Sequence, residues 1–242
     1  MSERNLENKT AIVTGGTRGI GQAIAGRLLD EGAQVAICGI RQKSVDDALN
    51  ILSPKGHVFG MVADVSKIED VRNFIGAVIR QFRTVNILVN NAGAGIFRGV
   101  ADLEPEEWQR MIGLNLTGAY YCCHEILPIF IQSGNGDVVN IGSLAGKNAF
   151  AGGAGYNASK FGLNGFSEAI MLDYRNAGVR VSTIMPGSVD TDFGGAPANV
   201  PSAAWKIAPD DIAEIVVTLL RMPRRTTISQ VEVRPSRPPR QT

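Results

Sequence analysis

The sequence of 242 residues predicts an α/β fold with a doubly wound, mainly parallel sheet and helices on both faces. Short β-branched and apolar runs alternate with segments of helical periodicity from one end to the other. The runs are apolar on both faces, as in strands buried on both sides. Strand, helix and strand in repetition require crossover connections and hence a parallel sheet. With no linker or internal repeat, we expect a single domain over 1–242, with a core of about 8–235 and a tail at 236–242.

The expected elements follow in order along the chain. Each expected strand is an apolar run that stops at a turn residue, and the ranges are 10–15, 33–39, 85–93, 136–143, 179–187 and 227–235. Each expected helix carries apolar residues three or four apart, and the ranges are 19–31, 68–82, 106–132, 154–177 and 210–221. Pro128 lies inside the third of these helices and is expected to bend or end it, because proline removes a helix hydrogen bond.

The composition excludes several kinds of partner. A formal net charge of +1 gives no global field that would draw the chain to nucleic acid or a membrane surface. No apolar run approaches the ~20 residues of a membrane span, and the polar N-terminus is unlike a signal peptide. Three cysteines do not indicate a disulfide framework, and two distant histidines predict no metal site. We therefore expect a cytoplasmic protein with a small-molecule substrate.

The glycine-rich stretch "TGGTRGIG" (14–21) lies between the first expected strand and the first expected helix. In an open parallel sheet this is the place where a dinucleotide binds. Gly15 suits the tight turn, Gly19 lets the backbone approach a pyrophosphate, and Gly21 lets the helix pack close to the strand. The helix N-terminus would offer unpaired N–H groups to the phosphates. A glycine cluster alone is also compatible with a bare turn.

The segment "YNASK" (156–160) places a phenol and an ammonium on one helix face, because positions i and i+4 lie together. A nearby cation favours the phenolate and lowers the pKa of Tyr156, which suits general acid–base catalysis. Lys160 has three donors and could also hold a ribose hydroxyl. Ser143 ends an expected strand, where its hydroxyl could donate to a substrate carbonyl. An ordinary helix with a packed tyrosine and a surface lysine is the alternative.

Taken in order, these motifs resemble those of the short-chain dehydrogenase/reductase (SDR) family. The shared features are Thr-Gly-x-x-x-Gly-x-Gly at 14–21, "NNAG" at 90–93, Asn115, Ser143, the Tyr156/Lys160 pair, and "PG" at 186–187 with Thr191 beyond. The resemblance covers about residues 8–235 and implies a Rossmann-type fold.

The resemblance also implies an activity. It predicts an enzyme that interconverts a carbonyl and an alcohol by hydride transfer with a nicotinamide cofactor. Tyr156 would give its proton to the substrate oxygen and Ser143 would hold that oxygen. Lys160 would lower the tyrosine pKa and bind the nicotinamide ribose, and Asn115 would relay protons through water. For Asn115, a hydrogen bond to the helix backbone is the alternative.

By the same resemblance, the cofactor would lie along residues from six segments. These are Gly15, Thr17, Arg18, Gly19, Ile20, Gly21, Arg41, Asp64, Val65, Asn91, Ala92, Gly93, Tyr156, Lys160, Pro186, Gly187, Val189 and Thr191. For Asp64, a helix cap is a comparable interpretation.

The end of the second expected strand predicts NADP(H), with NAD(H) as the second choice. NAD enzymes place an acid there for the ribose 2′-hydroxyl, and this chain has Gly39. Arg18 and Arg41 lie near that position, and guanidinium groups bind phosphate in a bidentate way. The common NADP pattern of the family has its basic residue one place earlier, where Ile40 stands.

The substrate region is described by composition only. Small residues precede Tyr156, and 192–205 has the composition of a mobile lid. The expected wall residues are Phe97, Leu144, Phe193 and Trp205, although plain packing also explains them. An apolar or aromatic carbonyl compound fits better than a highly charged one. By analogy with the family, the chain would form a homodimer or homotetramer. The competing functions are a dinucleotide-sensing binding module and an epimerase or dehydratase on the same fold.

Overall fold

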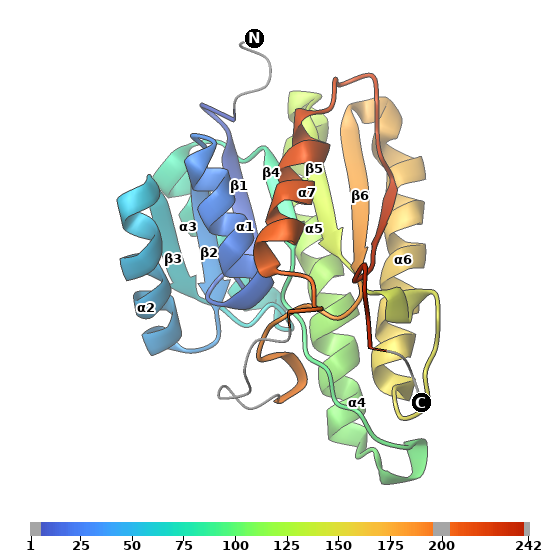
Figure 1. The fold of residues 1–242 in the computed structure, drawn as a ribbon. Coiled ribbons are helices and arrows are strands. Elements are labelled where there is room, and N and C mark those ends of the chain that lie inside the picture. The colour runs from blue at the N-terminus through green and yellow to red at the C-terminus, as the bar shows by residue number, and fades with distance from the viewer. Residues whose placement is uncertain (1–5, 196–203, 240–242) are drawn as a thin grey trace.

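Every strand pairing in the computed structural model is parallel, and the described residues are 6–195 and 204–239. The strands are β1 Thr10–Thr14, β2 Gln34–Gly39, β3 Val58–Val62, β4 Ile87–Asn90, β5 Gly136–Ile141, β6 Val179–Pro186 and β7 Gln230–Val233. They form one sheet in the order β3-β2-β1-β4-β5-β6-β7 (Figure 1). The expected doubly wound parallel sheet is confirmed.

Helices cover both faces of this sheet (Figure 1). The helices are α1 Gly19–Asp30, α2 Gln42–Leu52, α3 Ile68–Phe82, α4 Pro105–Ile112, α5 Gly118–Ser133, α6 Ala154–Tyr174 and α7 Pro209–Arg221. One apolar cluster joins α1, α2 and α7 to one face, and a second joins α3, α5 and α6 to the other. Neighbouring strand residues go to opposite clusters, with Val13 in the first and Ile12 in the second. The period of two in a strand produces this division.

The chain reverses its direction of travel across the sheet at β1. From β1 it moves outward to β2 and β3, and then returns to the other side of β1 to continue with β4, β5, β6 and β7. The loops that follow β1 and β4 therefore part from each other at the carboxyl edge of the sheet. Ligands of doubly wound sheets bind in the crevice at such a point.

The sequence pattern predicts neither β3, at the outer edge of the sheet, nor α2, the helix that packs on it. β3 is only half-buried and contains Gly60, so it lacks the long apolar run of a central strand. α2 packs above it, and a Cβ at Gly60 would lie 2.9 Å from a methyl carbon of Val45 in that helix. Gly60 therefore allows helix and strand to approach closely.

The middle helix differs from its expected form. It begins as α4, passes through a π-helical segment at Gly113–Thr117, and continues as α5 to Ser133. Pro128 lies inside α5 and does not end it, contrary to one expected outcome. The π-helical turn shifts the helical register at Asn115, a local change that is frequent at functional sites.

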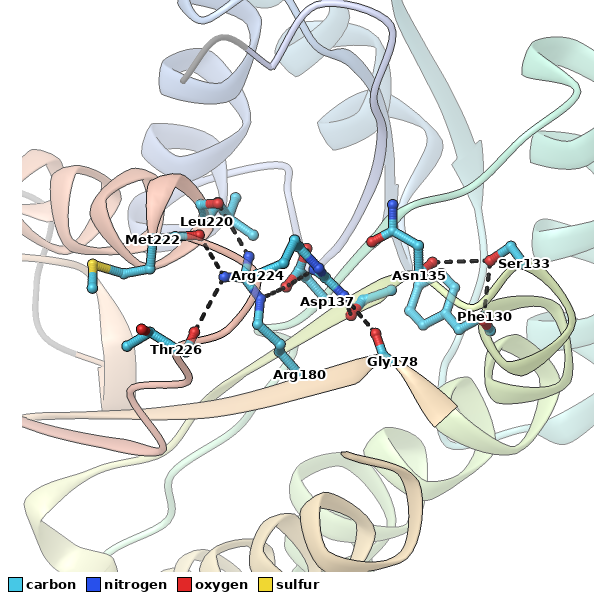
Figure 2. A network of polar contacts seen from close by, with 11 residues as sticks. Phe130, Ser133, Asn135, Asp137, Gly178, Arg180, Leu220, Met222, Arg224 and Thr226 are labelled. Atoms are coloured by element: carbon cyan, nitrogen blue, oxygen red, sulfur yellow. Dashed lines mark hydrogen bonds and ion pairs between the residues drawn. The ribbon is translucent and has the colours of Figure 1, made fainter. Parts of the chain in front are cut away.

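A hydrogen-bond network centred on Arg180 lies where β5 and β6 begin, at the edge of the sheet opposite the crevice (Figure 2). The Arg180 guanidinium, on β6, donates to the Asp137 carboxylate of β5 at 2.6 Å. Its other nitrogens donate to the carbonyl oxygens of Leu220 at 3.1 Å and Met222 at 2.7 Å, at the end of α7. Arg224 binds the same carboxylate at 2.9 Å. The network fastens the end of α7 to the sheet, so it anchors the fold away from the site.

Among the described residues, no helix is long and apolar enough to cross a membrane. All three cysteines, Cys38, Cys122 and Cys123, are buried as free thiols.

Candidate active site

The glycine turn after β1 has the shape that its sequence predicts. Gly15 and Gly19 have φ values of 62° and 53°, in the left-handed region that favours glycine. A Cβ at Gly21 would lie 2.3 Å from the Gly15 carbonyl oxygen, so only glycine lets α1 pack on the turn. The first turn of α1 carries no acidic residue, and Arg18 at the N-cap makes no side-chain capping bond. The helix N-terminus thus remains available to an anion.

The turn is joined to the segment after β4 by polar contacts. The Asn91 and Ala92 amides donate to the Thr14 hydroxyl at 3.0 and 3.1 Å. The Asn91 side chain donates to the carbonyl oxygens of Thr14 at 2.9 Å and Gly15 at 3.1 Å. These bonds hold the two walls of the crevice together. β4 ends at Asn90, directly before the residues that make these bonds, so this strand is shorter than the expected 85–93.

Tyr156 and Ser143 come together beside the carboxyl end of β5. Ser143 follows β5, and its hydroxyl accepts the Ala145 amide at 3.1 Å. Tyr156 lies in the first turn of α6 and is 8% exposed. Burial raises the pKa of the Tyr156 phenol, and a hydrogen bond with the Ser143 side chain lowers it in part. The expected lowering of the tyrosine pKa is therefore wrong for the chain as described, because desolvation outweighs the neighbouring groups.

Lys160 is buried one helical turn after Tyr156. Its ammonium donates to the Ile141 carbonyl oxygen at 2.8 Å and lies 5.8 Å from the centre of the tyrosine ring. Burial lowers the pKa of Lys160 to about 8. A Cβ at Gly93 would lie 3.9 Å from this nitrogen, so Lys160 borders the same crevice as the segment after β4. The expected alternative of a surface lysine is excluded.

Asn115 holds the loop after β4 rather than its own helix. Its side chain accepts the Ala94 amide at 2.8 Å and donates to the Ala94 carbonyl oxygen at 2.9 Å. It also donates to the Ser159 hydroxyl at 2.9 Å. The expected alternative, a bond to the helix backbone, is not what the structure shows. Asn115 instead links the π-helical turn, α6 and the loop.

The segment after β6 lies against the glycine turn. A Cβ at Gly19 would lie 3.2 Å from the Thr191 methyl carbon. Val189 pairs with Ile207 in an isolated parallel bridge, which fixes the segment in front of α7. Gly187 lies beside Leu144 and Pro235, since a Cβ there would be 3.2 and 3.1 Å from their side chains. Pro235, which follows β7, therefore packs next to the site.

The end of β2 meets the glycine turn at one corner. A Cβ at Gly39 would lie 2.7 Å from the Thr17 methyl carbon, so this strand end is in contact with the turn. Arg18 follows Thr17, is exposed, and lies 3.8 Å from the Asp192 carboxylate. Arg41 is the N-cap residue of α2 and is exposed. Arg18 and Arg41 thus lie next to this contact along the chain, and Gly39 stands where NAD enzymes carry an acid.

Other expected cofactor residues lie in this crevice or beside it. Val65 is buried and would be 2.9 Å from a Cβ at Gly118. Asp64 accepts both the amide and the hydroxyl of Ser66, at 3.0 and 2.7 Å. It does not cap α3, whose N-cap is Lys67.

Two phenylalanines contact the tyrosine ring, and a third contacts one of the two. Phe97 is 5.5 Å and Phe193 is 5.7 Å from Tyr156 between ring centres. Phe150 is 5.7 Å from Phe97. The sequence predicts Phe97 and Phe193 as wall residues but not Phe150, whose only signal is its place in the small-residue segment before Tyr156. Trp205 makes no ring contact within the described residues, and the part of the expected lid at 196–203 lies outside them.

The residues present fit a nicotinamide dinucleotide. The left-handed glycines, the uncapped N-terminus of α1 and the glycine beside Lys160 leave backbone where a pyrophosphate and a ribose need close approach. Among the described residues, no cluster of histidine, cysteine and acidic side chains could hold a metal ion.

A parallel sheet with a glycine turn of this kind is typical of dinucleotide-binding folds, and comparison with known proteins identifies the family. The family model of the short chain dehydrogenases matches residues 9–198. The chain is 36% identical over 204 residues to a 3alpha-hydroxysteroid dehydrogenase of Mediterraneibacter gnavus, covering 83% of this chain and 80% of that protein. The chain therefore belongs to the short-chain dehydrogenase family of oxidoreductases.

Two solved structures support the same conclusion. An alcohol dehydrogenase of the archaeon Thermococcus sibiricus, complexed with 5-hydroxy-NADP, has a TM-score of 0.88 and 30% identity, over 96% of this chain and 99% of that one. A metagenomic short-chain oxidoreductase in complex with NADP has a TM-score of 0.84 and 34% identity, over the same shares of the two chains.

Proposed function

We propose that the protein is an NADP(H)-dependent oxidoreductase that interconverts a carbonyl compound and its alcohol. The observation that carries the proposal is the meeting of Tyr156, Ser143 and Lys160 at the carboxyl edge of the sheet, beside the glycine turn. The names of the relatives support it, since an alcohol dehydrogenase and a hydroxysteroid dehydrogenase both act on a hydroxyl-bearing carbon. In this proposal the chain works as one catalytic unit.

Each polar side chain has a distinct part in the proposed reaction. Ser143 donates a hydrogen bond to the substrate oxygen and stabilises the charge that develops there. Tyr156 transfers the proton from its phenol oxygen to that substrate oxygen, and takes it back in the reverse direction. Lys160 places its positive charge beside the tyrosine ring and stabilises the phenolate that remains. Reduced nicotinamide, when bound, supplies the hydride.

Asn115 is a positioning residue in this proposal. It holds both backbone groups of Ala94, so it sets the wall of the crevice that faces Lys160. A water bound next to these groups would complete the proton relay implied by the family resemblance.

The pKa directions suit the reduction of a carbonyl. A raised pKa keeps the Tyr156 phenol protonated at neutral pH, as a proton donor must be. With a pKa of about 8, Lys160 is mostly charged at pH 7 and becomes neutral as the pH rises. We therefore expect reduction to decline above about pH 8.

The decisive experiment follows the loss of NADPH absorbance with a panel of ketones, aldehydes and quinones. Tyr156→Phe removes only the phenol oxygen, and we expect it to lower kcat by roughly 10²–10⁴-fold, the usual contribution of a general acid. Tyr174→Phe, at the far end of the same helix, is the matched control and should keep wild-type turnover. Cofactor binding without turnover of any panel member would favour a dinucleotide sensor. A changed substrate without net oxidation of NADPH would favour an epimerase or dehydratase.

The preference for NADP(H) rests on the corner formed by the glycine turn and β2. Arg18 and Arg41 would pair with the 2′-phosphate, and Gly39 provides no carboxylate for a free 2′-hydroxyl. Titration calorimetry should show that Arg18→Ala and Arg41→Ala each weaken NADPH binding about tenfold and leave NADH binding unchanged. Lys43→Ala, in the first turn of α2 and paired with Asp47, should change neither affinity. An equal loss for both cofactors would contradict the proposal.

We also propose a homodimer or homotetramer in the cytoplasm. Tyr120 on α5 and Phe161 and Leu172 on α6 are exposed apolar side chains on the two helices that the family resemblance assigns to subunit contact. Three buried free thiols suit a reducing compartment. Light scattering of the purified protein tests the assembly, and a monomeric mass would refute it.

A further inference from the structure

Three phenylalanines from three different loops gather beside the proposed catalytic tyrosine: Phe97 and Phe193 contact its ring, and Phe150 contacts Phe97. Phe97 follows β4, Phe150 follows β5 and Phe193 follows β6, and these are adjacent strands of the sheet. Their exposed fractions are 46%, 45% and 41%, whereas Tyr156 is 8% exposed. Large apolar side chains that gather at the surface mark binding sites more often than chance packing. We call Phe97, Phe150 and Phe193 the phenylalanine triad.

Glycines lie next to the triad at positions where a Cβ would collide with the rings. A Cβ at Gly95 would lie 2.6 Å from a Phe193 ring carbon and 2.8 Å from a Phe97 ring carbon. A Cβ at Gly153 would lie 2.6 Å from the Phe150 ring. Glycine at both positions therefore leaves the room that the three rings occupy.

The geometry of the rings is that of aromatic pairing. Phe97 meets Tyr156 edge to face at an interplanar angle of 82°, and Phe193 meets it at 55°. Edge-to-face and tilted pairs use the quadrupole of the ring, which a saturated ring of the same size lacks.

The charges next to the triad are directed elsewhere. Arg98 follows Phe97 but pairs with Glu107 at 3.1 Å, and Asp192 precedes Phe193 but faces Arg18. The rings thus form an apolar surface beside the phenol, and the charged side chains next to Phe97 and Phe193 in the chain face other residues.

We propose that the phenylalanine triad binds an aromatic ring next to the reacting carbonyl, so that the enzyme prefers aryl ketones and aryl aldehydes to saturated compounds of the same skeleton. This inference rests on the proposed function, because it assigns the substrate class of the same site. Ring contacts with the exposed faces of the triad would stabilise the aryl group through pairing as well as burial.

The test compares acetophenone with cyclohexyl methyl ketone, which share a carbon skeleton and differ in aromaticity and planarity. We expect kcat/KM with NADPH to be on the order of tenfold higher for acetophenone. Phe97→Leu, Phe150→Leu and Phe193→Leu should each reduce that ratio several-fold, mainly through KM. Phe82→Leu, at the end of α3 and away from the site, should leave it unchanged. Turnover of both ketones at equal kcat/KM would overturn the inference while leaving the proposed function intact.

A binding experiment distinguishes failure of the proposed reaction from failure of the triad to bind an aromatic ring. If neither ketone is reduced, saturation-transfer NMR of each ketone with the NADP⁺-loaded protein measures ring binding directly. Stronger transfer to acetophenone, lost in Phe97→Leu, would support the triad and refute only the proposed reaction. Equal transfer to both ketones, or transfer unchanged in all three triad variants, would refute the inference.

Discussion

The ammonium of Lys160 lies 5.8 Å from the centre of the Tyr156 ring, and both side chains are buried. Burial disfavours the charged form of both side chains, so it lowers the pKa of Lys160 to about 8 and raises that of Tyr156. Such opposed shifts in one crevice are typical of proton-transfer sites. They also make the stability of the protein depend on pH.

The first prediction concerns that dependence. Between pH 8 and about 10.5 the unfolded chain binds the Lys160 proton and the folded chain does not, so the unfolding free energy of the wild type rises with pH. This lowering of the Lys160 pKa corresponds to a rise of roughly 3 kcal/mol in the unfolding free energy between these two pH values. Lys160→Met lacks the titration, so the wild type should gain on this variant as pH rises. Urea denaturation at pH 7, 8.5 and 10 measures the difference.

The control is Lys43→Met. Asp47 raises the pKa of Lys43, which is the opposite direction, so the wild type should not gain on this variant with pH. A difference between wild type and Lys160→Met that stays constant across the three pH values would show that Lys160 is not desolvated in the folded protein.

The second prediction tests Asn115 as an anchor for the loop after β4. Asn115→Ala leaves the Ala94 amide and carbonyl without their partner, which should lower the unfolding free energy by roughly 2 kcal/mol. Hydrogen exchange at the Ala94 amide should accelerate more than exchange in β4. Asn50→Ala, at an exposed position of α2, is the control and should change neither quantity. Unchanged exchange at Ala94 in the first variant would contradict the anchoring role.

The third prediction compares two glycines of one helix. A Cβ at Gly21 would lie 2.3 Å from the Gly15 carbonyl oxygen, whereas at Gly26 the nearest side-chain atom is 3.5 Å away. Gly21→Ala should therefore destabilise the protein by roughly 3 kcal/mol and weaken dinucleotide binding. Gly26→Ala should stabilise it by up to about 1 kcal/mol through helix propensity. Thermal unfolding of both variants checks the contrast, and equal melting temperatures would refute the packing argument.

The fourth prediction separates stability from activity at the amino edge of the sheet. Arg180→Leu leaves the carbonyl oxygens at the end of α7 without their donor and weakens the pairing of Asp137 (Figure 2). Breaking a buried pair costs about 3–5 kcal/mol. At a temperature where the variant is folded, kcat/KM should match the wild type, because the network is remote from the site. Arg225→Leu, an exposed neighbour, should show neither effect. A selective loss of kcat/KM in folded Arg180→Leu would mean that the network reaches the site.

The central elements were predictable because their signals are local. A buried parallel strand needs a continuous apolar run, and five of the seven strands are buried along most of their length. β3 escaped prediction because an edge strand with one half-exposed face and a glycine has no such run. α5 continues past Pro128 because of its packing, and the local helix preferences of the residues do not predict that packing.

The candidate site divides in the same way. The spacing of Tyr156 and Lys160 and the glycines of the turn are short-range patterns, so their juxtaposition could be expected. The partner of Asn115 is 21 residues away, and the ring contact between Phe97 and Phe150 joins two loops. Contacts of this kind require the whole fold. The pKa of Tyr156 was misjudged for a related reason, since desolvation depends on neighbours that come from several segments.

The contact between Thr17 and Gly39 constrains how this protein could change its cofactor during evolution. A Cβ at Gly39 would lie 2.7 Å from the Thr17 methyl carbon, so an aspartate introduced there first would meet an occupied space. A lineage moving toward NAD(H) would have to shorten or reorient Thr17 before the acid became useful. The two positions are therefore expected to change in a fixed order, and Gly39→Asp should be tolerated in a Thr17→Ser or Thr17→Gly background before it is tolerated in the parent.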